Sequence, residues 1–123
     1  QNEARAERLR HVLRSVAQQE LPSDDADLIV AVSWSAVGEA VAAAVWRALA
    51  GSEHLISVQQ QGSCSQFQHM AHALAAAEAA LLQRLGSKGS GRSVWVVFGD
   101  DDDVWHHRRV SEYVRAIRSH PAL

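Results

Sequence analysis

Hydrophobic residues recur with helical spacing in four segments of the chain. These segments are residues 2–20, 35–51, 65–86 and 107–119. In the first, Leu9, Val12, Leu13 and Val16 fall on one face and leave the arginines to solvent. The pattern predicts an amphipathic helix at the start of the chain, followed by three more helices.

Residues that favour helix ends mark the limits of these segments. Ser35 is placed to cap the second helix, and Gly51 to end it in a left-handed conformation. Ser65 and Gln68 have the spacing of a capping box at the start of the third helix. Pro22 ends the first helix, because proline lacks a backbone donor and biases the preceding residue away from the helix.

Three short apolar runs lie between the helices. They are residues 28–33, 55–59 and 94–98, and none alternates strictly between apolar and polar positions. Such runs fit strands that are buried on both faces, as in a parallel sheet. The order of one helix followed by β-α-β-α-β-α therefore predicts an α/β, Rossmann-like fold. We expect a small parallel sheet of about three strands flanked by helices, with an N-terminal amphipathic helix.

Composition limits the size and class of the protein. A chain of 123 residues that is 47% hydrophobic suits one compact unit, which we divide into an N-terminal helix (1–22) and an α/β domain (23–123). A net charge of -2 gives no basic surface for nucleic acid. No apolar run has the length of a membrane span, and Cys64 has no partner for an internal disulfide. Gln1 is expected to be either a processed end of the chain or an artificial boundary of the sequence. The sequence does not indicate the cellular compartment of the protein.

Parallel α/β sheets bind ligands outside the carboxyl ends of their strands. This rule brings residues 33–35, 59–63 and 100–103 to one edge of the sheet. The last of these is a run of four aspartates. A hard divalent cation such as Mg²⁺ or Mn²⁺ would relieve their mutual repulsion, since these ions prefer oxygen ligands. An exposed acidic loop that binds nothing is the alternative.

The acidic run follows the apolar residues 94–98 and Gly99, and precedes Val104, Trp105 and the last helix. This motif resembles the acidic signature of family 2 glycosyltransferases of the GT-A fold, and the likeness extends in element order over residues 27–119. The resemblance implies that Asp100 lies near a ribose and that Asp102 holds a metal bridging a diphosphate. It makes Asp103 a second acidic contact.

At the end of the first strand, the resemblance implies that Ser33 and Trp34 cradle the base, with a tryptophan in the core as the other interpretation of Trp34. The chain also departs from the family pattern. Gln60 and Gln61 stand where an aspartate usually contacts the base, and His107 stands where proline is usual. The family's acceptor-binding half and catalytic base are not expected in this chain.

Two functions therefore stay open from the sequence. The first is a glycosyltransferase-like domain that binds a nucleotide-sugar diphosphate through Mn²⁺ or Mg²⁺, with catalysis undecided. The second is a non-catalytic accessory or scaffold subunit of a larger assembly, membrane-bound or not, in which arginines of the first helix (Arg5, Arg8 and Arg14) face an acidic partner protein.

Two further readings of the motifs are disfavoured. An aspartate-nucleophile phosphatase needs a lysine downstream of the acidic turn, and none follows Val104. Histidine pairs at His69 and His72, and at His106 and His107, lack the spacing of known zinc motifs. Half-exposed polar histidines are the expected outcome.

Overall fold

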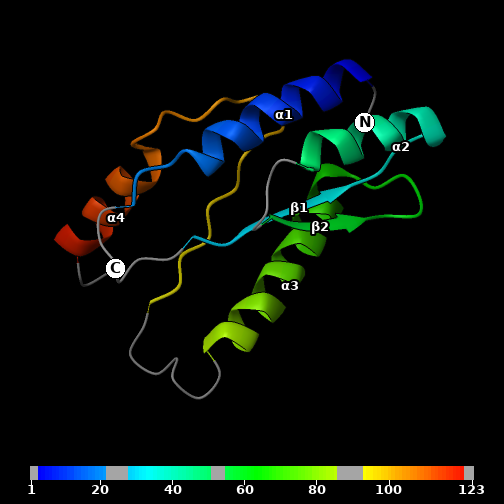
Figure 1. Ribbon diagram of the computed structural model, residues 1–123. Helices are drawn as coiled ribbons and strands as arrows, with labels where there is room; N and C mark the ends of the chain where they lie inside the picture. The colour runs from blue at the N-terminus through cyan, green and yellow to red at the C-terminus, as the bar shows by residue number, and fades with distance from the viewer. Residues whose placement is uncertain (1–2, 22–27, 51–54, 86–92, 121–123) are drawn as a thin grey trace.

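A computed structural model describes residues 3–21, 28–50, 55–85 and 93–120 of the protein (Figure 1). Its elements are α1 (Glu3–Ala17), β1 (Val30–Trp34), α2 (Glu39–Leu49), β2 (Leu55–Gln59), α3 (Gln66–Leu85) and α4 (Arg109–Ser119). All four predicted helices and the first two predicted strands are therefore present. The predicted helix ends at Pro22, Gly51 and Gly86 lie outside the described residues.

The two strands form a small parallel sheet. Their register pairs Val30 with Leu55 and Trp34 with Gln59, and α2 makes the crossover between them. Helix α3 packs on both strands, while α1 packs on α2 (Figure 1). The predicted α/β class, with a small parallel sheet flanked by helices, is confirmed.

The hydrophobic core lies between α1, α2 and the sheet. Its central cluster consists of Ala6, Leu9, Leu13, Trp34, Val45 and Leu49. The α1 residues in it recur three and four positions apart, so they occupy the single face that the sequence pattern predicted. Side chains alternate along a strand, and accordingly Trp34 enters this core while the neighbouring Ser33 contacts α3 on the opposite face.

The third strand predicted at residues 94–98 does not form. The segment has no ladder partner in the described part of the chain and runs as a plain yellow trace in Figure 1. Its five apolar side chains are 44–58% exposed. The apolar run suits a strand covered on both faces, but α1 is packed on α2 and α3 on the two strands, and the run itself stays about half exposed.

The two predicted caps have different outcomes. The capping box is confirmed, because the Gln68 amide donates to Ser65 Oγ (3.2 Å) and the Ser65 amide donates to Gln68 Oε1 (2.8 Å). Ser35 is not the cap of α2. That helix begins at Glu39 after Gly38, whose φ of 85° is a left-handed conformation that glycine adopts without strain.

Gln19 fastens the segment before α4 to the end of α1. Its side-chain amide nitrogen donates to the carbonyls of Ser15 (3.1 Å) and His106 (2.7 Å), and its oxygen accepts from the Val110 amide (2.9 Å). The Trp105 amide adds a bond to Ser15 Oγ (2.9 Å). This connection fixes the chain that follows the acidic turn.

Candidate functional site

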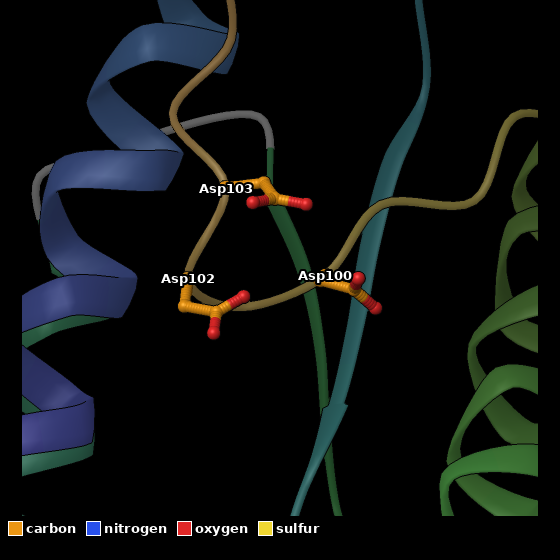
Figure 2. A group of neighbouring side chains, drawn as sticks. All are labelled: Asp100, Asp102 and Asp103. Carbon is orange, nitrogen blue, oxygen red and sulfur yellow. The ribbon is translucent and has the colours of Figure 1, made fainter.

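Three of the four aspartates in the acidic turn converge. Asp100, Asp102 and Asp103 each offer one carboxylate oxygen, and these oxygens lie within 4.8 Å of one another on exposed side chains. Figure 2 shows the three carboxylates on one turn, with α1 on one side and α3 on the other. Asp100, Asp102 and Asp103, which the sequence analysis assigned to the ribose and the metal, thus lie together.

Asp101 has a different role from its three neighbours. Its carboxylate lies 2.9 Å from the guanidinium of Arg5 in α1, and both side chains are partly exposed. Such a pair is worth at most about 1 kcal/mol, because water screens it. On the other side of the turn, Gln66 at the start of α3 donates to Asp100 Oδ1 (3.1 Å). Side chains from two helices therefore hold the turn.

The converging carboxylates are suited to a hard cation. All the donors are oxygens, which Mg²⁺ and Mn²⁺ prefer, and both ions keep several positions for water or phosphate. Among the described residues, no salt bridge reaches Asp102 or Asp103. Exposed carboxylates of this kind are also common without a metal, and two surface hollows of the protein lie elsewhere, on α1–α2 and on α4.

The ends of β1 and β2 carry a second polar group. The Gln60 backbone amide donates to the Trp34 carbonyl (2.8 Å), which extends the strand pairing by one residue. The Gln60 side chain donates to Ser33 Oγ (3.3 Å), and Ser33 lies 2.8 Å from Nδ1 of His69. The parallel sheet thus joins Ser33 and Gln60 at one edge, as predicted. Gln61 is exposed in the turn after β2.

Trp34 occupies the core rather than the edge. Only 1% of it is exposed, its indole nitrogen donates to Ser57 Oγ (2.9 Å), and its ring meets Trp46 edge-on at 5.5 Å. No ring face of Trp34 is open, so a nucleobase could stack there only if the core rearranged.

Gln66, and the contact of His69 with the strand ends, are features of the site that the sequence analysis did not predict. Both residues lie in the first turn of α3, one helical turn apart, where Gln66 faces the acidic turn and His69 faces the strand ends. The capping box at Ser65 was the available clue, because it places the start of α3 at the carboxyl edge of the sheet.

Burial lowers the pKa of His69 below its ordinary value of 6.5, and the nearby His72 lowers it further. The unfolded chain therefore binds a proton at this residue more readily than the folded protein does. The stability that His69 contributes is fully present above the unfolded pKa and is lost as the pH falls through the folded pKa.

We predict that the free energy of unfolding of the wild type falls more steeply than that of a His69→Gln variant between about pH 7.5 and about pH 5. Glutamine keeps a polar side chain at this position but does not titrate. Urea denaturation followed by circular dichroism at several pH values measures both slopes. Parallel slopes would contradict the lowered pKa.

Among the described residues, no histidine belongs to a group of potential metal ligands. His69 is bonded to serine, and His106 and His107 stack on each other with ring centroids 4.2 Å apart. In the described part of the chain, the one group of potential metal ligands is the aspartate group of the acidic turn.

Comparisons with models of protein families, with curated proteins and with solved structures found no match to this chain. Within the described residues, none of the helices has both the length and the apolar character needed to cross a membrane.

Proposed function

We propose that this domain binds a divalent cation at Asp102 and Asp103 and, through that cation, the diphosphate of a nucleotide sugar whose ribose lies against Asp100. The convergence of three exposed carboxylate oxygens within 4.8 Å is the observation that carries the proposal. The acidic motif and the order of the helices and strands support a relationship to the front half of a GT-A glycosyltransferase.

Different residues of the site serve the metal with its diphosphate, the ribose and the base of the proposed ligand. Asp102 and Asp103 supply charge to Mn²⁺ or Mg²⁺, and diphosphate oxygens complete the coordination shell. Asp100, oriented by Gln66, stands nearest the ribose in the manner of the family that the motif resembles. Ser33 and the amides of Gln60 and Gln61 offer hydrogen bonds to a base edge, in place of the missing aspartate.

The test begins with the metal alone. Isothermal titration of the protein with Mn²⁺ is expected to show binding at one site. An Asp102→Asn variant should bind Mn²⁺ at least about tenfold more weakly, because a lost ligand costs no less than a lost supporting contact around a metal. Far-ultraviolet circular dichroism should show an unchanged fold, since the side chain is exposed.

Asp101→Asn is the matched control. It removes the same charge from the adjacent residue, but Asp101 pairs with Arg5 and lies outside the converging group. We expect it to change Mn²⁺ affinity by less than about threefold, the effect of a nearby charge in water. Equal losses in the two variants would show that the turn attracts cations only by its overall charge.

Nucleotide sugars are then titrated with and without Mn²⁺. The proposal expects binding of a uridine or guanosine diphosphate sugar that requires Mn²⁺ and disappears in Asp102→Asn. If Mn²⁺ binds and no nucleotide sugar does, the domain is a metal-binding domain without this substrate. Absence of heat with Mn²⁺ itself would remove the basis of the proposal.

A non-catalytic scaffold subunit is the second candidate, and the apolar segment 94–98 favours it. Five successive large apolar side chains that are each about half exposed are unusual on a monomer and typical of an interaction surface. Native mass spectrometry of the protein purified from its own cells tests this function. A stable complex that is lost in a Trp95→Asp variant would support it, and a monomer that binds Mn²⁺ would oppose it.

A further inference from the structure

Four polar side chains at the carboxyl edge of the sheet form a hydrogen-bonded chain centred on His69. Ser33 Oγ lies 2.8 Å from Nδ1 of the imidazole, and Ser35 Oγ lies 3.4 Å from its Nε2. Gln60 Nε2 donates to Ser33 Oγ at 3.3 Å. All four residues are partly exposed, so a small molecule in solution can reach them.

The direction of the two bonds to the imidazole depends on the tautomer of His69. An amide nitrogen only donates, so the oxygen of Ser33 accepts from Gln60. When the neutral ring of His69 carries its proton on Nε2, the hydroxyl of Ser33 donates to the unprotonated Nδ1, and Nε2 donates to Ser35 Oγ.

A serine hydroxyl that donates to a neutral imidazole is the arrangement by which a histidine activates a nucleophile. Burial lowers the pKa of His69, which keeps the ring neutral and able to accept a proton near pH 7. The sequence separation of 36 residues shows that the fold itself, through the packing of α3 on β1, brings the pair together.

We propose that Ser33 is a nucleophile, with His69 as its general base, toward ester-type acyl and phosphonyl groups. The bond from Ser33 Oγ to the carbonyl carbon forms while the bond from that carbon to the leaving oxygen breaks. The serine proton passes to His69 Nδ1 and then to the leaving alcohol. Water next attacks the acyl-serine, gives its proton to His69, and releases the acid and the restored hydroxyl of Ser33.

The proposal goes beyond binding of a nucleotide sugar and does not depend on it. No step uses the acidic turn or a metal, so the two proposals can fail separately. A purely structural contact that ties α3 to β1 is the competing role for the pair. That role affects stability but gives Ser33 no reactivity beyond that of an ordinary serine.

Reaction with an alkyl fluorophosphonate tests the proposal. In this reagent Ser33 Oγ replaces fluoride on phosphorus, and the stable adduct is located by peptide mass spectrometry. We expect one adduct per folded wild-type chain, on Ser33, and none after unfolding in urea. Ser33→Ala should abolish the adduct, and His69→Gln should slow its formation at least about 100-fold, the usual contribution of a general base.

Ser57→Ala is the matched control, because Ser57 lies in the same sheet but its hydroxyl accepts from the Trp34 indole and contacts no base. It should leave the rate of labelling unchanged, as should Asp102→Asn, which separates this result from the metal proposal. Circular dichroism verifies that each variant is folded. No adduct on Ser33 in the folded wild type, or a rate that His69→Gln does not change, would overturn the proposal.

Discussion

Replacing Trp34 with alanine is expected to lower the free energy of unfolding by about 3–5 kcal/mol, the usual cost of truncating a large buried aromatic side chain. Trp34 is 1% exposed and belongs to the cluster that joins α1, α2 and β1. The truncation also removes the indole donor to Ser57 Oγ. Urea denaturation followed by circular dichroism at 222 nm measures the loss.

Trp46→Ala is the control for this prediction, because it removes the same side chain from the aromatic neighbour of Trp34. Trp46 is 52% exposed and meets the ring of Trp34 edge-on at 5.5 Å. The expected loss is about 1 kcal/mol, the value of one aromatic pair. Similar losses in the two variants would mean that Trp34 is not the centre of the core.

Local sequence patterns predicted the parts of the fold that depend on local interactions. The apolar face of α1 follows from residues three and four positions apart, and the start of α3 follows from the reciprocal bonds of Ser65 and Gln68. The same kind of local pattern predicted a third strand at residues 94–98, and that prediction is wrong. An apolar run such as 94–98 becomes a strand only where other elements cover it, and that depends on how α1 and α3 pack.

Part of the candidate site could likewise be predicted from the sequence, and part could not. The aspartates are adjacent in sequence, so their grouping could be predicted, and the rule for parallel sheets joined Ser33 to Gln60. The contact of Ser33 with His69 depends on the rotation of α3 about its axis, which no spacing in the sequence reveals. The burial of Trp34 was also open from the sequence, because it depends on which face of β1 the pleat of the strand gives to this side chain.

The connection made by Gln19 links the stability of the fold to the site. We predict that Gln19→Ala releases residues 105–110 from the end of α1, because it removes two bonds to carbonyls and the acceptor of the Val110 amide. Local opening of this segment should become easier by about 1–3 kcal/mol, the value of two or three partly exposed hydrogen bonds. Hydrogen exchange of the Val110 amide should accelerate about tenfold or more as a result.

Gln18→Ala provides the control for this substitution. Gln18 is the adjacent residue and has the same side chain, but it is exposed, and no side-chain hydrogen bond of Gln18 occurs among the described residues. We expect it to leave exchange at Val110 unchanged. The Glu112 amide, which donates to the Arg108 carbonyl, reports on the first turn of α4. Faster exchange at Val110 with little change at Glu112 would show that Gln19 holds the segment before α4 rather than the helix itself, whereas equal exchange in both variants would show that Ser15 and the backbone contacts suffice.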